Sequence, residues 1–309
     1  MRIAFRIDIS NKIGTGHYMR MSALAEAFEK LGHTCKFFKG EDEPVDYSGF
    51  DIIVLDTYQV SDEYIAGLNA PNRTLVCYDD NALYTYNCDI LINANLYAEE
   101  LSFRLSDKIP HMLLGGRYAL LRREFRDSIQ ITVNEHAYKV FVCFGGSDMR
   151  NITPRVVEAL QGIDGIQLSV VLGEYTECDE EVYAVSGGNT IVYKTPESMY
   201  DIMRRCDIAV ASSGTMAYEM AAIGLPAISI TQADNQFLIG EYMLRNKLMK
   251  CIGNWKNVDL TRLKDEVTLL LGDSGRRKTE SAGLLKAVDK NGAINAAREI
   301  IELHLSTNQ

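Results

Sequence analysis

The alternation of short apolar runs with amphipathic stretches is the feature that most limits how this chain can fold. Buried parallel strands appear in a sequence as short apolar runs, and the crossover helices between them appear as amphipathic stretches. Over the first part of the chain, strands are predicted at residues 2–8, 34–38, 51–56, 73–78, 89–92 and 111–114. The main helices between them are predicted at residues 17–31 and 61–68. This pattern indicates a doubly wound α/β unit.

The segment 115–137 interrupts the alternation. It is rich in arginine and ends in a polar run, so we interpret it as a linker between domains. The alternation then restarts, with strands at 138–143, 166–171, 190–193, 207–211 and 226–230, helices at 153–161, 197–204, 215–223 and 236–246, and a helical region at 259–304. We therefore predict two Rossmann-like domains, at residues 1–125 and 138–309. They should face each other across a cleft, with the ligand between them at the carboxyl ends of the strands.

Length and charge agree with this organisation and limit the partners. At 309 residues the chain exceeds the roughly 150 residues of one typical domain. Its net charge of -10 argues against nucleic acid as a partner, because phosphate backbones are bound by basic surfaces. A single nucleotide diphosphate is still possible, because backbone N–H groups at a helix N-terminus can hold it.

Several patterns bear on the compartment and on metals. The start, MRIAFRIDIS, lacks the apolar stretch of a signal peptide, and no window approaches the roughly 18 apolar residues of a membrane span. The seven cysteines are scattered without a CxxC pair, which favours reduced thiols in a cytoplasmic protein. The adjacent Asp79 and Asp80 point to opposite faces, and the histidines show no ligand spacing. We expect a monomer with neither metal nor cofactor.

Three glycine-bearing turns join a predicted strand to a predicted helix. They contain Gly14, Gly16 and His17; Gly145, Gly146 and Ser147; and Ser213, Gly214 and Thr215. Such turns place N–H groups at the positive end of a helix dipole, where a phosphate can bind. For any one turn, a tight connection without a ligand is the favoured interpretation. Two such turns in the second domain favour a diphosphate site, although neither GxGxxG nor a P-loop is present, which disfavours an ordinary NAD or ATP site.

Two further groups in the second domain could bind a nucleotide sugar. Glu219 lies one helical turn after Thr215, where its carboxylate could accept both hydroxyls of a ribose; an ordinary solvated helix residue is an equal alternative. Asn235 and Gln236 follow a strand and could bind the sugar, although capping of the next helix by Asp234 would also explain this segment.

His17 is the candidate for the chemistry. The positive end of a helix dipole disfavours an imidazolium there, and a neutral imidazole is what a general base needs at neutral pH. The alternatives are an exposed histidine or a packing role. Other polar residues should share this carboxyl edge of the first sheet: Asp8, the run Tyr78-Asp79-Asp80-Asn81, Asn93 and Asn95. Of these, we predict that Asp8, Tyr78, Asp79, Asn93 and Asn95 form a substrate site.

Taken together, these segments resemble the nucleotide-sugar hydrolases of pseudaminic acid biosynthesis and the related spore-coat polysaccharide family. The resemblance rests, in order along the chain, on FRIDISNKIGTGHYMR, YDD, CDILINANLYA, GGRYALLRREF, FVCFGGSD, SSGTMAYEMAAIGLPAISI and DNQ. One departure is Tyr86-Asn87 before CDIL, where the family often has a histidine; it bears on the fit of the sugar.

The resemblance implies a GT-B fold, with the nucleotide on the C-terminal domain. It implies that His17 is the catalytic base, and that the glycine turns of the second domain and Glu219 hold uridine diphosphate. The implied reaction is metal-independent hydrolysis, with inversion, of a UDP-linked 2,4-diacetamido-2,4,6-trideoxy-β-L-altropyranose in bacterial nonulosonic acid biosynthesis. Two alternatives stay open: a glycosyltransferase of the same fold, in which the base activates an acceptor hydroxyl, and a nucleotide-sugar binding protein without catalysis.

Overall fold

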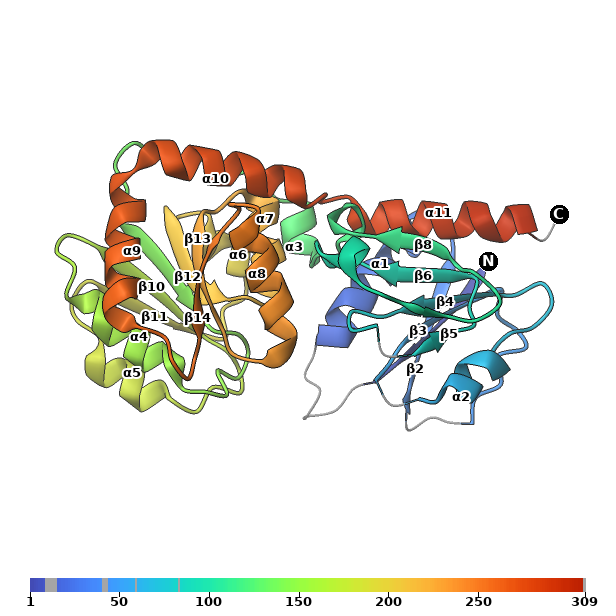
Figure 1. The fold of residues 1–309 in the computed structure, drawn as a ribbon. Helices are drawn as coiled ribbons and strands as arrows, with labels where there is room; N and C mark the ends of the chain where they lie inside the picture. Colours follow the sequence, from blue (N-terminus) through green and yellow to red (C-terminus); the bar gives the residue numbers. More distant parts are fainter. Residues whose placement is uncertain (9–15, 41–43, 59, 83, 308–309) are drawn as a thin grey trace. The chain divides into compact units, whose positions relative to one another are not determined.

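The computed structural model describes residues 1–8, 16–40, 44–58, 60–82 and 84–307. The chain divides into two compact units, one formed by Met1–Arg126 with Val288–Gln309 and the other by Asp127–Ala287 (Figure 1). In the described part of the chain, no helix is both long and apolar enough to cross a bilayer. All seven cysteines are free thiols, and five of them are buried.

The first unit is built on a six-stranded parallel sheet in the order β2-β1-β3-β4-β6-β8. The strands are β1 (Arg2–Ile7), β2 (Thr34–Lys39), β3 (Ile52–Asp56), β4 (Thr74–Tyr78), β6 (Ile90–Asn93) and β8 (His111–Leu114). The six predicted strands are thus confirmed. The sequence did not predict the small parallel pair β5 (Thr85–Tyr86) and β7 (Arg104–Leu105), because strands of two residues carry no periodicity.

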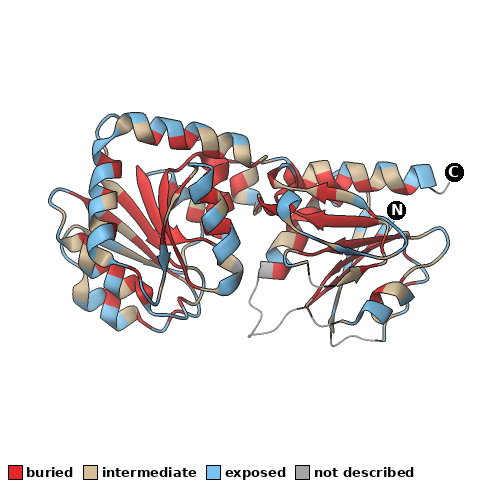
Figure 2. Cartoon of the chain, in the orientation of Figure 1, coloured by how far each residue is buried: buried red, intermediate tan, exposed pale blue. Residues whose placement is uncertain are grey.

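Helices cover both faces of this sheet. The predicted helices are confirmed as α1 (Gly16–Lys30) and α2 (Asp62–Gly67). Met21, Leu24 and Phe28 of α1 are buried in the core on one face, and Ile65 of α2 belongs to the separate core on the other. In Figure 2 the strands are mostly buried, whereas the helices alternate between buried and exposed residues. Gly32 ends the region of α1 with φ +84°, the left-handed conformation that a helix stop requires.

The last helix, α11 (Gly292–Thr307), corrects the predicted domain boundary. Residues 288–309 were assigned to the second domain, but they belong to the first unit, where α11 packs on α1. The buried stripe Ala293, Ala296, Ala297 and Ile300 completes the core of the first unit. An amphipathic pattern shows that a helix has a buried face, but it does not show which sheet that face covers. The prediction assigned the helix to the domain that precedes it in the sequence, and that assignment was wrong.

The predicted linker, 115–137, is also divided between the units. Its first part forms η3 (Gly116–Tyr118) and α3 (Arg123–Arg126) within the first unit, and from Asp127 onward the chain belongs to the second unit. Gly292 helps to explain why the first part of this segment belongs to the first unit. A Cβ at Gly292 would lie 2.3 Å from the Ala119 carbonyl oxygen, so the start of α11 fits closely against the segment after η3.

The second unit repeats the architecture, with strand order β11-β10-β9-β12-β13-β14 and parallel pairing throughout. Its strands are β9 (Lys139–Cys143), β10 (Gln167–Leu172), β11 (Thr190–Lys194), β12 (Ile208–Ser212), β13 (Ala227–Thr231) and β14 (Lys250–Asn254). Its helices are α4 (Ile152–Gln161), α5 (Asp179–Val185), α6 (Met199–Met203), α7 (Thr215–Ile223), η4 (Asp234–Gln236), α8 (Phe237–Arg245), α9 (Leu260–Gly272) and α10 (Ser274–Ala287). Neither α5 nor β14 was predicted; the strand contains Gly253 at φ +111° and pairs irregularly, which weakens its strand signal.

A buried arginine fixes the end of α9. The side chain of Arg277 is fully buried, and its guanidinium donates to the carbonyl oxygens of Leu270 and Leu271 and to those of Asn134 and Glu135. The last carbonyls of a helix have no partner within it, so the cation satisfies them and also fastens the segment before β9.

Candidate functional site

In both sheets the strand order reverses beside the first strand of the unit. In the first unit β1 lies between β2 and β3, and in the second β9 lies between β10 and β12. Connections on either side of such a point leave in opposite directions and open a crevice at the carboxyl ends of the strands. The predicted site residues follow these strands, so each sheet is considered at this edge.

His17 lies in the first turn of α1, and its imidazole is almost fully buried. Nδ1 lies 2.8 Å from Oδ1 of Asp56, the last residue of β3, which is completely buried. An ionised carboxylate only accepts hydrogen bonds, so we assign the proton of a neutral imidazole to Nδ1 and the lone pair to Nε2. Within the described residues Nε2 has no hydrogen-bond partner. This is the arrangement of a base oriented by a carboxylate.

Arg20, one turn further along α1, binds the same carboxylate. Its Nε donates to Asp56 Oδ2 at 2.7 Å and its Nη2 to Oδ1 at 2.6 Å, which makes a bidentate pair. Burial acts to raise the pKa of Asp56, but the charge of Arg20 and hydrogen bonds from Arg20 and His17 outweigh it and hold that pKa below its usual range. Asp56 is therefore ionised at neutral pH.

Asp80 and Tyr58 extend the cluster. Arg20 Nη1 donates to Asp80 Oδ2 at 2.8 Å, and the Tyr58 hydroxyl lies 2.7 and 2.8 Å from the two carboxylate oxygens of Asp80. The Tyr58 ring meets the imidazole of His17 edge-on, with centroids 4.5 Å apart. Burial raises the pKa of Tyr58, so its hydroxyl remains a neutral donor.

The structure places Asp8 in a supporting position. Its carboxylate accepts from Arg6 Nη1 at 2.8 Å, from the Thr57 hydroxyl, and from the Tyr58 backbone N–H at 3.0 Å. These contacts fix the segment that follows β3, and so hold Asp56 and Tyr58 in place. A role of Asp8 in binding substrate stays a prediction.

The other predicted residues of this edge lie after β4 and β6. Tyr78 ends β4, and Arg20 lies over its ring at 4.3 Å. Asp79 is buried and accepts the Asn81 N–H, while Asn95 donates to the Asp80 carbonyl oxygen at 3.2 Å.

Asn93 ends β6, and its Oδ1 accepts the N–H of Asn95 at 3.0 Å. Its Nδ2 is buried without a hydrogen-bond partner in the described chain. The structure thus gathers Asp8, His17, Tyr78, Asp79, Asn93 and Asn95 along one sheet edge. Gly16 is the first residue of α1, and Gly14 lies outside the described residues.

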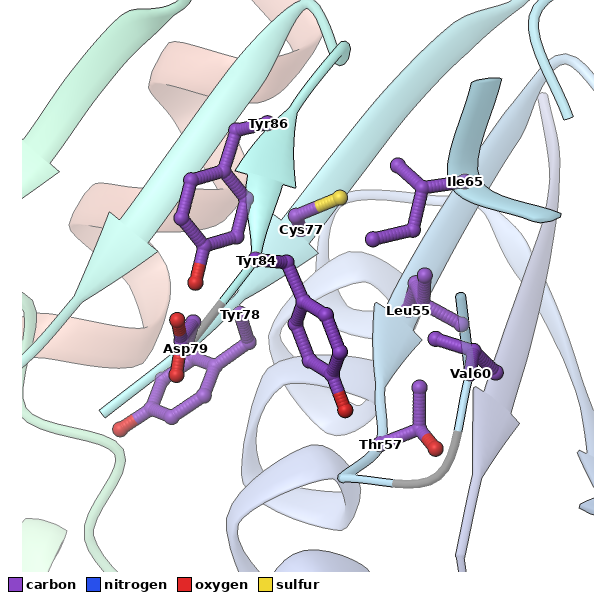
Figure 3. Close-up of a pocket in the computed structure, with 9 residues that line it drawn as sticks. All are labelled: Leu55, Thr57, Val60, Ile65, Cys77, Tyr78, Asp79, Tyr84 and Tyr86. Atoms are coloured by element: carbon purple, nitrogen blue, oxygen red, sulfur yellow. The ribbon is translucent and has the colours of Figure 1, made fainter. Parts of the chain in front are cut away.

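A small pocket adjoins this edge on the α2 face of the sheet (Figure 3). Its volume is about 10 Å³, roughly the space of one water molecule, so it cannot hold a nucleotide sugar. The Tyr86 hydroxyl points toward Asp79 in this pocket, and it is buried without a hydrogen bond to any described residue.

In the second unit the two glycine turns differ. Asp148 occupies the start of α4: its carboxylate accepts the N–H groups of Ile152 at 3.2 Å and Thr153 at 2.9 Å. The expectation of unpaired N–H groups there is therefore wrong at these two positions, because a side chain already caps the helix. Gly146 instead fits closely against Gly173, where a Cβ would lie 2.3 Å from the Gly146 carbonyl oxygen.

Gly145 and Ser147 flank that close contact. Gly145 has φ +92°, which a residue with a side chain rarely adopts, and Ser147 is half-buried. Both therefore lie in a turn that is shaped by packing, and a role in binding UDP stays a prediction for them.

The start of α7 is more open. Gly214 is its N-cap residue and provides no side-chain cap, and Thr215 is its first residue. Gln236 reaches back to this turn: its Nε2 lies 3.3 Å from where a Cβ of Gly214 would be, and its Oε1 accepts the N–H of Gln232 at 2.9 Å. Ser213 is buried, and its Oγ has no hydrogen bond in the part of the chain that the structure describes.

Glu219 is buried in α7, so the alternative of a solvated helix residue is wrong. Asn235 lies in η4, and the structure does not describe its side chain. Asp234 begins η4 and is not a cap, since Ala233 is the N-cap of η4 and Gln236 that of α8. Among the described residues, no group of three or more His, Cys, Asp and Glu side chains is placed to hold a metal ion.

Sequence reasoning missed three members of the cluster at His17, namely Asp56, Arg20 and Tyr58. Asp56 carries a usable signal, because a charged residue that ends a buried apolar strand lies at the carboxyl edge of the sheet. Arg20 follows His17 by one helical turn, and Tyr58 follows a strand. Their mutual contacts depend on the order of β1, β3 and β4, which the sequence does not state.

Comparison with known proteins gives distant relatives. Residues 138–280 match a family described as "Protein of unknown function (DUF354)". The chain is 25% identical over 274 residues to the uncharacterized protein MJ1062 of Methanocaldococcus jannaschii, covering 76% of this chain and 57% of that protein. It is 24% identical over 261 residues to the UDP-2,4-diacetamido-2,4,6-trideoxy-beta-L-altropyranose hydrolase of Campylobacter jejuni, covering 76% and 93%.

Solved structures resemble the whole chain. MurG of Acinetobacter baumannii superposes with a TM-score of 0.69 at 11% identity, covering 98% of this chain and 100% of that one. The spinosyn rhamnosyltransferase SpnG, complexed with thymidine diphosphate, gives a TM-score of 0.65 at 13% identity, covering 97% and 100%. At these identities the likeness shows the fold alone. The chain has the GT-B fold, with two Rossmann-like α/β units, each built on a six-stranded parallel sheet.

Proposed function

We propose that the chain is a nucleotide-sugar enzyme, and that its reaction is hydrolysis of a UDP-linked 2,4-diacetamido-2,4,6-trideoxyhexose to UDP and the free sugar with inversion. The observation that carries the proposal is the buried His17–Asp56 pair at the strand-order reversal of the first sheet. The hydrolase from Campylobacter supports the substrate class, because the match covers 93% of its length.

In the proposed step, His17 Nε2 removes a proton from a water molecule, and the water oxygen bonds to the anomeric carbon. The bond from that carbon to the phosphate oxygen breaks, and its electron pair leaves with UDP. Attack opposite the leaving group inverts the anomeric configuration, through a transition state with oxocarbenium character. UDP is already a good leaving group, so the step requires no strong general acid.

The second unit is assigned the nucleotide. Its best-supported contact is the N-terminus of α7, where Gly214 and Thr215 present backbone N–H groups without a side-chain cap. The helix dipole there would stabilise the negative charge that develops on the departing diphosphate. We assign Ser213 and Gln236 to the same site because both lie at this turn, and Glu219 to the ribose.

A glycosyltransferase is the second candidate, favoured by the fold: the solved structures that resemble the chain include glycosyltransferases. The same imidazole would then activate an acceptor hydroxyl in place of water. A binding protein without catalysis is the third, and it predicts saturable binding without turnover.

One experiment separates these candidates. The enzyme is incubated with the UDP-diacetamido sugar in ¹⁸O water without any acceptor, and the products are followed by NMR and mass spectrometry. Release of UDP with ¹⁸O at the anomeric carbon of an inverted free sugar supports hydrolysis. Release only after an acceptor is added supports transfer, and binding without release supports the third candidate.

The matched variant is His17→Asn. Loss of a general base typically lowers kcat by about 10²–10⁴-fold, while UDP binding should be unchanged. A His17→Asn enzyme with wild-type turnover would refute the assignment of the base.

A further inference from the structure

We propose that Arg20 and Asp80 act together as a charge counterweight that sets how strongly His17 holds a proton. Both are positioning residues, because they act through His17 and Asp56. The catalytic meaning of the inference rests on the proposed function, but the charge balance itself is a property of the free protein and can be measured without substrate.

The counterweight follows from how the charges are connected. Arg20 bridges two carboxylates, those of Asp56 and Asp80, through three hydrogen bonds of 2.6 to 2.8 Å. With neutral His17 the cluster has a net charge of -1, and proton uptake by His17 brings it to zero. The cluster therefore already carries the negative charge that balances the imidazolium formed when His17 takes up a proton.

Arg20 and Asp80 act on the protonation of His17 in opposite directions, because their charges are opposite. Arg20 Nη2 lies 3.2 Å from His17 Nδ1, so its positive charge acts against an imidazolium in the resting protein. Asp56, at 2.8 Å, favours the imidazolium, and Asp80 adds to this by partly neutralising Arg20. Because these groups are largely buried, dissolved salt screens them weakly.

The remaining titratable groups at this edge do not replace these residues. Among the described residues they are Tyr18 on α1, Arg6 and Asp8 at β1, Lys36 and Lys39 on β2, Tyr58 after β3, and Tyr78 and Asp79 at the end of β4. Arg6 and Asp8 pair with each other, and burial raises the pKa of Tyr58 and of Tyr78, which keeps both neutral. Glu299 on α11, the helix that packs on α1, accepts a hydrogen bond from Tyr118 of η3 at 2.9 Å.

The test is an NMR titration of the free protein with labelled histidine. The chain has five histidines, and the spectrum of His17→Asn identifies the resonances of His17. In Arg20→Gln the titration midpoint of His17 should rise by about 1–3 pH units, the usual effect of one close charge. In Asp80→Asn, which keeps the shape and one acceptor oxygen, the midpoint should fall by a smaller amount.

Two controls make the result specific. The double variant Arg20→Gln/Asp80→Asn has the wild-type net charge, so its midpoint should lie between those of the single variants. Glu29→Gln removes an exposed charge from the far end of α1 and should leave the midpoint unchanged. Shifts of both single variants in the same direction, or no shift in either, would overturn the proposal.

The experiment stays decisive if Arg20→Gln does not fold. Arg20→Lys keeps the charge and should keep the wild-type midpoint, and Asp80→Asn alone must lower it; a rise or no change refutes the inference. Hydrolysis assays on the same proteins keep the two ideas apart. Expected shifts without any UDP release from the wild-type protein would refute only the proposed function, whereas His17-dependent hydrolysis without shifts would refute only the counterweight.

Discussion

Replacing Asp56 by Asn tests how the buried carboxylate works. Asp56 is fully buried and accepts three hydrogen bonds, one from His17 and two from Arg20. An Asn side chain has a single acceptor oxygen. If that oxygen stays with Arg20, the amide NH₂ faces Nδ1 of His17, which must then become the acceptor and move its proton to Nε2.

An imidazole that carries its proton on Nε2 cannot take a proton from water there. We therefore expect Asp56→Asn to lower kcat by about 10²–10⁴-fold, the range for losing a general base, while KM for the UDP-sugar changes little. Steady-state release of UDP measures both constants. Because the proposed nucleotide site lies in the second unit, UDP affinity by calorimetry should match wild type, which provides the internal control.

The same change has a second, separable effect. Removing one partner of a buried ion pair typically costs about 3–5 kcal/mol, a large share of the roughly 5–15 kcal/mol that stabilises a typical domain. Thermal unfolding should therefore show a clear loss of stability, and kcat must be measured where the variant is fully folded. A folded Asp56→Asn protein with kcat within tenfold of wild type would refute the orienting role of Asp56.

Four further predictions concern stability. Arg277→Met leaves four carbonyls without their donor, including those of the buried Leu270 and Leu271, and should cost about 3 kcal/mol or more in denaturant unfolding. The more exposed Arg276→Met should cost about 1 kcal/mol or less; equal costs would contradict the role of Arg277. Tyr86→Phe removes a hydroxyl that makes no hydrogen bond to any described residue, so it should be neutral or stabilise by up to about 1 kcal/mol; a large loss of stability would show that the hydroxyl has a partner. Gly292→Ala should cost about 1–3 kcal/mol, since its Cβ would lie 2.3 Å from a carbonyl oxygen, and an unchanged melting temperature would contradict that contact. Asp56 has a folded-state pKa below its unfolded value of about 3.9, so its contribution is present above that pH and is lost as pH falls through the lower folded value; acid unfolding of wild type against Asp56→Asn checks this.

Most of the sheet architecture could be predicted because buried parallel strands are written locally as apolar runs. Ile52 to Leu55 and Val140 to Cys143 are examples: every residue is buried, and the sequence shows it directly. The placement of α11 could not be predicted, because its apolar stripe fits either sheet. Contacts with residues far away in the sequence decide which sheet the helix covers.

The candidate site was predictable in part for a similar reason. His17 stood out because a glycine turn and a helix start are local features. Arg20 lies on the same helix as His17, but Asp56 and Asp80 come from two other segments, and only the neighbouring positions of β1, β3 and β4 bring these two carboxylates to the cluster. The capping of α4 by Asp148 was equally hidden, since the turn resembles an open phosphate site until the side chain is placed.

The return of α11 to the first sheet has a consequence for synthesis on the ribosome. All residues of the second unit, 127–287, are translated before the first has its last helix, and Ala293 to Ile300 supply part of the first hydrophobic core. Nascent domains usually fold in the order in which they emerge. Here the first unit is begun first but completed last. One face of its sheet therefore stays incompletely covered until α11 leaves the ribosomal exit tunnel.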